Sequence, residues 1–266
     1  MYKIKRALIT GVSSGIGRAV ADKLISMGSE VYGLDVAETA EKEGLRFFRC
    51  DITDEALVER LKEQLVSERV VFDTIVNVAG VHMMTSLVEG DYSKMKRLID
   101  INLCGVMLVN RAFHSLLERD GRILIVTSEV AGLDPLPFNG LYTVSKTALD
   151  SYAQALRQEL NLIGQKVITV RPGAIETPLA RESIGATEAL AAGTKLYTKG
   201  ASRFSSIAKK FMGKPISPEK LAAFITKILF RSHPKLTYSM HNNPGLVLLG
   251  ILPLRLQCFI IKMLLR

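Results

Sequence analysis

A short apolar segment that runs directly into a glycine-rich turn constrains the fold of this chain most. Residues 7–10 (Ala-Leu-Ile-Thr) predict a buried strand, and Gly11-Val-Ser-Ser-Gly-Ile-Gly17 follows at once. A helical pattern then covers residues 15–27 and ends at Gly28. A helix that begins in such a turn directs backbone N–H groups at an anion, so the segment predicts a phosphate site. The first glycine interval is one residue longer than in the standard dinucleotide-binding fingerprint.

The rest of the chain alternates between apolar strands and amphipathic helices. Strands are predicted at residues 31–35, 46–50, 74–77, 122–127, 166–171 and 235–240. Helices are predicted at 92–117, 142–163 and 218–230, besides one that Thr53 caps and that carries Leu57, Leu61 and Leu65. This alternation favours an α/β fold, a doubly wound parallel sheet of Rossmann type with helices on both faces.

We expect one catalytic domain over residues 1–240, because the length suits a single large α/β unit. Within it, residues 180–213 show weak periodicity after a predicted strand, which is typical of a mobile lid. A basic and aliphatic C-terminal extension follows over residues 241–266.

Positive charge is concentrated in the last quarter of the chain. The net charge is +9, and residues 199–266 hold twelve Lys or Arg against a single acid, Glu219. In the extension, Arg255, Lys262 and Arg266 interrupt aliphatic clusters, and no segment approaches the roughly 20 apolar residues that span a bilayer. The extension therefore either attaches peripherally to an anionic membrane, covers the substrate pocket, or packs on its own domain or a partner subunit.

Cysteine and histidine usage argues against several kinds of site. The three cysteines are widely separated, which indicates reduced thiols, and the four histidines form no metal-ligand spacing. The positive charge is not accompanied by a nucleic-acid recognition motif. The first strand begins too early to leave room for a cleavable signal peptide. We expect a cytoplasmic protein, possible peripheral membrane contact aside, with no metal and no nucleic-acid partner.

A tyrosine and a lysine four residues apart carry the most specific chemistry. Tyr142-Thr-Val-Ser-Lys146 lies in a predicted helix, where positions i and i+4 share a face. A nearby ammonium lowers the pKa of a phenol, but a shift from about 10 to about 7 needs roughly 4 kcal/mol, more than one lysine supplies. The oxidised nicotinamide of a dinucleotide would be a second cation. The two segments together predict hydride transfer at a carbon–oxygen bond, and helix geometry gives Ser145 no role in it.

Two further residues support this prediction. Asp35 ends the second strand, where a carboxylate accepts hydrogen bonds from ribose hydroxyls and repels a 2′-phosphate. Because the neighbouring Ser14 and Val36 carry no charge, we expect NAD rather than NADP. Ser128 follows the fifth predicted strand, and its hydroxyl is suited to bond a substrate carbonyl oxygen.

In this order and spacing, the motifs resemble those of the short-chain dehydrogenase/reductase family over about residues 5–179, and more loosely to residue 239. They are the turn at 10–17, Asp51, Asn77-Val-Ala-Gly80, Asn102, Ser128, Tyr142-x-x-Ser-Lys146 and Arg171-Pro-Gly-Ala-Ile-Glu-Thr177. The resemblance implies that Tyr142 is the general acid/base and that Lys146 lowers its pKa and holds the nicotinamide ribose. It also implies that Ser128 polarises the carbonyl and that Asn102 keeps a water linking Lys146 to solvent.

The same resemblance implies which residues bind the cofactor. Asp51 and Ile52 contact the adenine, and Thr177 reaches the nicotinamide amide. The expected set is Gly11, Ser13, Ser14, Gly15, Ile16, Gly17, Asp35, Asp51, Ile52, Asn77, Ala79, Gly80, Tyr142, Lys146, Pro172, Gly173, Ile175 and Thr177. At Val78 the chain departs from the asparagine usual in the family, so we expect a local loss of strand-connecting hydrogen bonds.

The C-terminal extension is similar to that of the family branch acting on steroids, retinoids and other lipid alcohols. Residues flanking the catalytic segments are candidates for an apolar wall, although core packing explains them equally well: Met83, Met84, Leu133, Phe138 and Leu179. We therefore expect an NAD-dependent oxidoreductase that interconverts a secondary alcohol and a ketone on a hydrophobic substrate. The alternatives are a 3-oxoacyl-[acyl-carrier-protein] reductase and a non-catalytic NAD-binding protein. By family analogy the chain forms a homodimer or homotetramer through helices at about 102–117 and 142–163.

Overall fold

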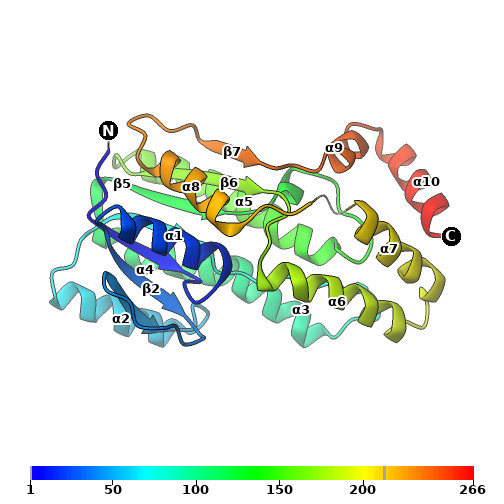
Figure 1. The fold of residues 1–266 in the computed structure, drawn as a ribbon, viewed down its shortest axis with the longest axis horizontal. Coiled ribbons are helices and arrows are strands. Elements are labelled where there is room, and N and C mark those ends of the chain that lie inside the picture. The colour runs from blue at the N-terminus through cyan, green and yellow to red at the C-terminus, as the bar shows by residue number, and fades with distance from the viewer. Residues whose placement is uncertain (1, 212–213) are drawn as a thin grey trace.

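The computed structural model describes residues 2–211 and 214–266, and within them the chain forms a seven-stranded parallel sheet (Figure 1). The strand order is β3-β2-β1-β4-β5-β6-β7. The strands are β1 (Arg6–Thr10), β2 (Glu30–Asp35), β3 (Leu45–Arg49), β4 (Phe72–Asn77), β5 (Leu117–Val126), β6 (Lys166–Pro172) and β7 (Thr237–Met240). Each neighbouring pair is parallel, which confirms the predicted doubly wound sheet.

Helices cover both faces of this sheet, and a separate apolar core lies under each set. On one face lie α1 (Gly15–Ser26) and α8 (Pro218–Leu229), and their buried residues include Val20, Leu24 and Ile225. On the other face lie α2 (Glu55–Ser67), α4 (Val106–Phe113) and α5 (Gly140–Asn161), whose buried residues include Leu61, Phe113 and Leu149. The sheet is apolar on both sides because both sides are covered.

Two local predictions differ from the structure. The helix predicted over residues 92–117 is a series of helical segments, namely α3 (Tyr92–Ile99), a π-helix (Asp100–Gly105), α4 and a 3-10 turn (His114–Leu116). Asp54, not Thr53, caps α2, because the Asp54 carboxylate accepts the Leu57 N–H at 3.0 Å. The Thr53 hydroxyl is instead bonded to Asp51 at 2.7 Å.

The carboxyl ends of the parallel strands gather the predicted motifs at one edge of the sheet. The glycine turn follows β1, and the segment Asn77–Gly80 begins at the end of β4, the neighbour of β1 on the side away from β2. Between β1 and β4 the strand order reverses direction, which is where open parallel sheets bind ligands. Ser128 follows β5, and Gly173 follows β6.

The segment expected to be a mobile lid, residues 180–213, is largely helical. It contains α6 (Pro178–Gly193) and α7 (Thr198–Phe211), while residues 212 and 213 lie outside the described residues. The turn between these helices is held by Glu89, whose carboxylate accepts the backbone N–H groups of Lys195 and Leu196 at 2.9 and 3.1 Å. The low apolar periodicity of this stretch therefore does not mean that it lacks helices.

The last residues form two further helices, α9 (Pro244–Gly250) and α10 (Leu254–Leu265), which pack on the same chain. Figure 1 shows α10 beside α7 at the end of the molecule farthest from α2. The Gln257 side chain donates to Asp134 Oδ2 at 2.7 Å, and Leu265 packs against the cluster of Phe138, Ala201 and Phe204. In the described part of the chain, no helix has the length and apolarity needed to cross a membrane.

Candidate active site

The glycine turn has the shape of a phosphate cradle. Gly11 and Gly15 adopt φ values of +77° and +54°, which favour glycine. A Cβ on Gly17 would lie 2.0 Å from the Gly11 carbonyl oxygen, so only glycine lets α1 start this close to the turn. Within the described residues the Ser14 side chain makes no capping hydrogen bond, which leaves the first N–H groups of α1 to an anion. The turn therefore fits a dinucleotide pyrophosphate, and Ser13 and Ile16 lie within it.

Asp35 lies at the end of β2, against this turn. Its carboxylate accepts the backbone N–H groups of Ser13 and Ala37 at 2.9 and 3.1 Å. The same carboxylate that is expected to bind ribose hydroxyls thus also holds the turn to β2.

Asp51 and Ile52 follow the end of β3, where the adenine is expected. Burial opposes ionisation of Asp51, but hydrogen bonds from Thr53 and from Arg97 Nη2, at 2.6 Å, lower the pKa of this carboxyl overall. Ile52 is buried against Gly105, where a Cβ would lie 2.8 Å from the Ile52 side chain. The structure therefore gives Asp51 a charged partner from α3, which was not expected from the sequence.

The connection between β1 and β4 is retained despite the valine at position 78. Thr10 Oγ1 accepts the backbone N–H groups of Val78 and Ala79, both at 3.1 Å. The expected local loss of hydrogen bonds therefore does not reach this connection, because a threonine side chain bonds the two backbone groups. The buried Asn77 side chain donates to Asn110 Oδ1 at 2.8 Å and so links β4 to α4.

Tyr142 lies in the first turns of α5, next to Ser128. Burial and the nearby Glu129 carboxylate raise the Tyr142 pKa to about 12 overall, although the Ser128 hydroxyl beside the phenol favours the phenolate. The protein alone therefore does not produce an acidic phenol, and the sequence had left that shift to a second cation besides Lys146. The physical reason is that burial removes water from the phenolate and only the neutral Ser128 hydroxyl compensates.

Lys146 is buried one helical turn beyond Tyr142. Its Nζ lies 5.9 Å from the centre of the Tyr142 ring and donates to the Val126 carbonyl oxygen at 3.4 Å. Burial lowers the pKa of Lys146 to about 8. The ammonium is thus held at the site without a carboxylate partner among the described residues, a state that a bound anion or hydroxyl group would stabilise.

Asn102 lies in the π-helix between α3 and α4 and is fully buried. Its Oδ1 accepts the Val81 N–H at 2.8 Å, and its Nδ2 donates to the Val81 carbonyl at 2.9 Å and to Ser145 Oγ at 3.0 Å. A Cβ on Gly80 would lie 3.1 Å from Asn102 Oδ1 and 3.4 Å from Lys146 Nζ. Gly80 therefore lies against both residues, and π-helical turns of this kind are frequent at functional sites.

The segment after β6 forms the other side of the site. Thr177 caps α6 by accepting the Ala180 N–H at 3.2 Å, and a Cβ on Gly15 would lie 3.2 Å from Thr177 Cγ2. Ile175 is buried and pairs with Ile216 in an isolated bridge. Gly173, after Pro172, cannot carry a side chain because a Cβ would lie 1.9 Å from the His241 carbonyl oxygen. The chain entering the C-terminal helices thus contacts the predicted nicotinamide side.

Sequence reasoning missed two residues of this site. The His82 ring lies 4.5 Å from the Tyr142 ring, centre to centre, and its Nε2 is 3.0 Å from Asn139 Oδ1. Burial lowers the pKa of His82, and its buried Nδ1 has no hydrogen-bond partner among the described residues. Ser145 receives the hydrogen bond from Asn102 and donates to the Tyr142 carbonyl at 2.7 Å. A lone histidine carries no spacing signal, and Ser145, although part of the Tyr142-x-x-Ser-Lys146 motif, was given no role, so neither was assigned from the sequence.

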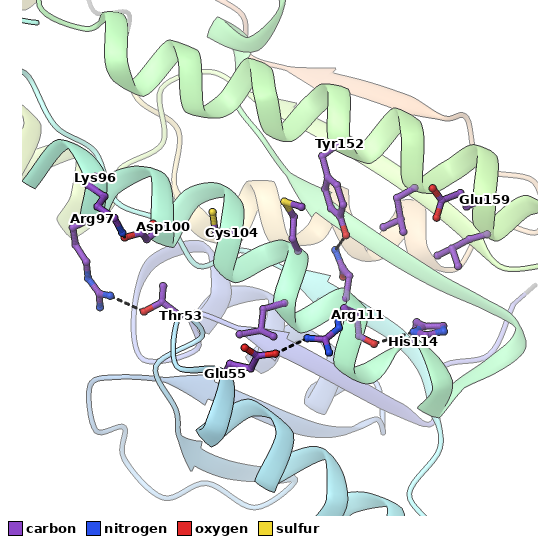
Figure 2. Close-up of a pocket in the computed structure, with 15 residues that line it drawn as sticks. Thr53, Glu55, Lys96, Arg97, Asp100, Cys104, Arg111, His114, Tyr152 and Glu159 are labelled. Carbon is purple, nitrogen blue, oxygen red and sulfur yellow. Dashed lines mark hydrogen bonds and ion pairs between the residues drawn. The ribbon is translucent and has the colours of Figure 1, made fainter. Parts of the chain in front are cut away.

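A surface hollow of about 780 Å³ lies elsewhere, on α3, α4 and α5 (Figure 2). Met107, Tyr152 and Leu156 line it, and an Arg111–Glu55 ion pair of 2.7 Å lies at its side. The four candidate catalytic residues do not line it. The hollow is therefore a feature of the outer helical surface and not of the site around Tyr142.

The fold and the site define a dinucleotide-dependent oxidoreductase. A family model described as short chain dehydrogenase matches residues 5–187. The chain therefore belongs to the short-chain dehydrogenase family and is an NAD(P)-dependent enzyme that acts on alcohol and keto groups.

Two relatives extend the match beyond the nucleotide-binding segments. A 3-ketodihydrosphingosine reductase of Bacteroides thetaiotaomicron is 29% identical over 229 residues, which cover 85% of this chain and 84% of the relative. An NADPH-dependent 1-acyldihydroxyacetone phosphate reductase of Schizosaccharomyces pombe is 31% identical over 201 residues, 73% of this chain and 68% of the relative.

Solved structures show the same fold. A short chain dehydrogenase of Burkholderia cenocepacia in complex with NADP superposes with a TM-score of 0.74 at 20% identity and covers 98% of each chain. A 3-ketoacyl-(acyl-carrier-protein) reductase of Brucella melitensis complexed with NADH gives a TM-score of 0.71 at 23% identity, over 89% of this chain and 96% of that one. Both NADP and NADH therefore occur among proteins of this fold.

The buried Lys146 predicts a pH-dependent stability. Below pH 8 the Lys146 side chain is charged in both the folded and the unfolded chain, so its burial lowers the free energy of unfolding by the full amount there. Between pH 8 and 10.5 the side chain is neutral in the folded chain and still charged in the unfolded chain, and this loss of stability becomes smaller as the pH rises. Lys146→Met should therefore raise the free energy of unfolding by up to about 3 kcal/mol at pH 7, and the gain should shrink towards pH 10. Urea unfolding of the cofactor-free protein at both pH values measures this, with the exposed Lys94→Met as the control. A gain independent of pH would contradict a buried ammonium.

Proposed function

We propose that this protein is an NAD-dependent oxidoreductase that interconverts a secondary alcohol and a ketone on a hydrophobic, lipid-like substrate. The observation that carries the proposal is the meeting of three side chains: the Ser128 hydroxyl lies beside the Tyr142 phenol, and the Nζ of the buried Lys146 lies 5.9 Å from the centre of the Tyr142 ring. These groups are the donors and the acid that reduction of a carbonyl requires.

Tyr142 would exchange a proton with the substrate oxygen. Ser128, beside the phenol, would bond the same oxygen and so orient it. In reduction the phenol gives up its proton as the carbonyl oxygen becomes a hydroxyl, and the Lys146 ammonium stabilises the phenolate left behind. Asn102, through its bonds to Val81 and Ser145, would hold the π-helical backbone in place and keep a water that resupplies the proton from solvent.

The residues present fit NAD(H). The turn from Gly11 to Gly17 would hold the pyrophosphate, Asp35 the adenosine ribose, and Lys146 the nicotinamide ribose. When bound, the cofactor supplies or accepts the hydride at the substrate carbon, and its oxidised ring adds positive charge near Tyr142. That charge opposes the burial that raises the Tyr142 pKa to about 12 in the protein alone.

An apolar cluster next to Asn139, whose side chain contacts the His82 ring beside Tyr142, supports a hydrophobic substrate and is called the apolar wall below. Phe138 adopts a left-handed backbone conformation with φ +64°, and its ring contacts Phe204 of α7 at 5.5 Å between centres. Met84 and Leu265 pack against the same cluster. The names of the two relatives, a 3-ketodihydrosphingosine reductase and a 1-acyldihydroxyacetone phosphate reductase, agree with a lipid-like ketone. The Leu179 side chain, another expected wall residue, lies outside the described residues.

Tyr142→Phe should lower kcat about a thousandfold, because it removes only the proton that is transferred. NADH absorbance measured with a long-chain ketone, a ketosteroid, a short polar ketone and a short 3-ketoacyl thioester gives the turnover. Tyr152→Phe on the same helix is the control, since its hydroxyl bonds Asn110 and lies away from Ser128. NADH binding should persist in both variants.

Two outcomes would favour a non-catalytic NAD-binding protein. One is that Tyr142→Phe leaves turnover unchanged, and the other is that the unaltered protein binds NADH but turns over none of the substrates. A clear preference for the 3-ketoacyl thioester would favour the acyl-carrier-protein reductase alternative.

Asp35 supports a preference for NAD over NADP, because its carboxylate would face a 2′-phosphate. Asp35→Ala should reduce the ratio of kcat/KM for NADH to that for NADPH by roughly a hundredfold, through loss of the ribose bonds and of the repulsion. Glu38→Ala removes a nearby exposed carboxylate and serves as the control. The Schizosaccharomyces pombe relative is named as NADPH-dependent, so the measurement distinguishes the proposed NAD preference from the cofactor of that relative. A higher kcat/KM for NADPH in the unaltered protein would contradict this preference.

We also propose a homodimer or homotetramer in which α4 and α5 supply an interface. The exposed Met107 and the neighbouring Leu156 give these helices an apolar strip beside the hollow in Figure 2. Met107→Glu should shift the protein towards monomer in light scattering, whereas Val66→Glu, on the exposed side of α2, should not. An unaltered protein that is monomeric at micromolar concentration would exclude the interface.

The cysteines are unpaired, which supports the reducing cytoplasm as the place of action.

A further inference from the structure

We propose that the outer face of α9 and α10 docks on an anionic lipid surface. Several apolar residues of this segment face water, whereas the polar Gln257 of α10 is buried. Gln257 is only 4% exposed, whereas Ile251, Leu254 and Phe259 are 73%, 64% and 59% exposed. A surface helix in water buries its apolar residues and exposes its polar ones. The outer face is therefore suited to an apolar medium.

The exposed apolar face does not result from a detached tail, because the inner side of α10 contacts the rest of the chain through Gln257 and Leu265. Gln257 donates to Asp134 Oδ2 at 2.7 Å and to the Leu252 carbonyl at 2.9 Å. Leu265 packs on the Phe138 cluster, and a Cβ on Gly200 of α7 would lie 3.3 Å from the Leu265 carbonyl. Figure 1 shows α10 alongside α7 at one end of the molecule. With α10 packed on α7 in this way, the apolar side chains of Ile251, Leu254 and Phe259 remain exposed to solvent.

The charges on this face complement anionic lipid. Arg255, Lys262 and Arg266 are exposed on α10 or at its end, and the chain has no Asp or Glu after Glu219. Lys199, next to Gly200 and hence to the end of α10, is also exposed. Basic residues among apolar ones at the rim of a helix are the composition of an interfacial segment, in which lipid phosphates attract the bases and the apolar side chains enter the acyl boundary.

The geometry favours a lipid surface over a second copy of this chain. In a twofold contact through this face, the three bases of one α10 would meet the same bases of the other with no acid to pair with, which is repulsive. The helices have 7 and 12 residues, so they suit a shallow position in the interface and not a crossing. The inner side of α10 contributes Leu265 to the apolar wall, so docking would place that wall beside the bilayer.

The experiment is co-sedimentation of the full chain with vesicles of phosphatidylcholine alone and of phosphatidylcholine mixed with phosphatidylglycerol. We expect binding to the anionic vesicles that weakens as salt is raised. Phe259→Ser with Met263→Ser tests the apolar contribution, and Arg255→Glu with Lys262→Glu tests the charge. Each pair should lower the partition coefficient roughly tenfold or more. All four side chains are exposed, so folding should persist, and circular dichroism checks this.

Matched controls are Leu162→Ser with Ile163→Ser, which are exposed apolar residues at the end of α5, and Arg60→Glu with Arg119→Glu. These should bind vesicles as the unaltered chain does. Turnover of a water-soluble ketone, measured in parallel, separates this proposal from the proposed activity. No binding to anionic vesicles by an active enzyme would overturn the docking surface and leave the activity standing. An equal loss of vesicle binding in the control variants would also overturn the docking surface. So would a change of oligomeric state in the Phe259→Ser/Met263→Ser variant if the unaltered chain did not bind vesicles.

Discussion

The burial of the Lys146 ammonium is the constraint on which the site depends. It lies below Tyr142, against Gly80 and the Val126 carbonyl, where burial lowers its pKa to about 8. The same burial raises the Tyr142 pKa to about 12, so the cofactor-free protein holds both groups nearer their neutral forms. A bound dinucleotide would offer ribose hydroxyls to the ammonium and positive charge to the phenol. The site is therefore built so that its acid–base chemistry is completed by the cofactor.

The surroundings of this pair come from segments far apart in the chain. The π-helix at Asn102 is joined to the segment after β4 through Val81 and to α5 through Ser145. His82 lies against the Tyr142 ring, and Glu89 holds the turn between α6 and α7. A parallel sheet makes this possible because all its strands end at one edge, so each following loop contributes to the same site.

The C-terminal helices link this site to the outer surface. On their inner side, the chain near His241 approaches Gly173, and Leu265 packs on the Phe138 cluster. Their outer side presents apolar and basic residues to solvent. The segment of α9 and α10 therefore contributes Leu265 to the Phe138 cluster on one side and presents an apolar and basic face on the other. These two roles account for its sequence of basic residues among aliphatic ones.

The sequence by itself determined the fold class, the glycine turn and the identities of Asn102, Ser128, Tyr142 and Lys146 as candidates, since local spacing and the order of strands carry that information. Only the tertiary structure decided which groups surround them. The helices of the expected lid, the Thr10 bonds behind Val78, the partners of Ser145 and the position of His82 all depend on contacts between distant segments. The pKa of Tyr142 likewise depends on burial as much as on neighbouring charge, and burial exists only in the folded chain.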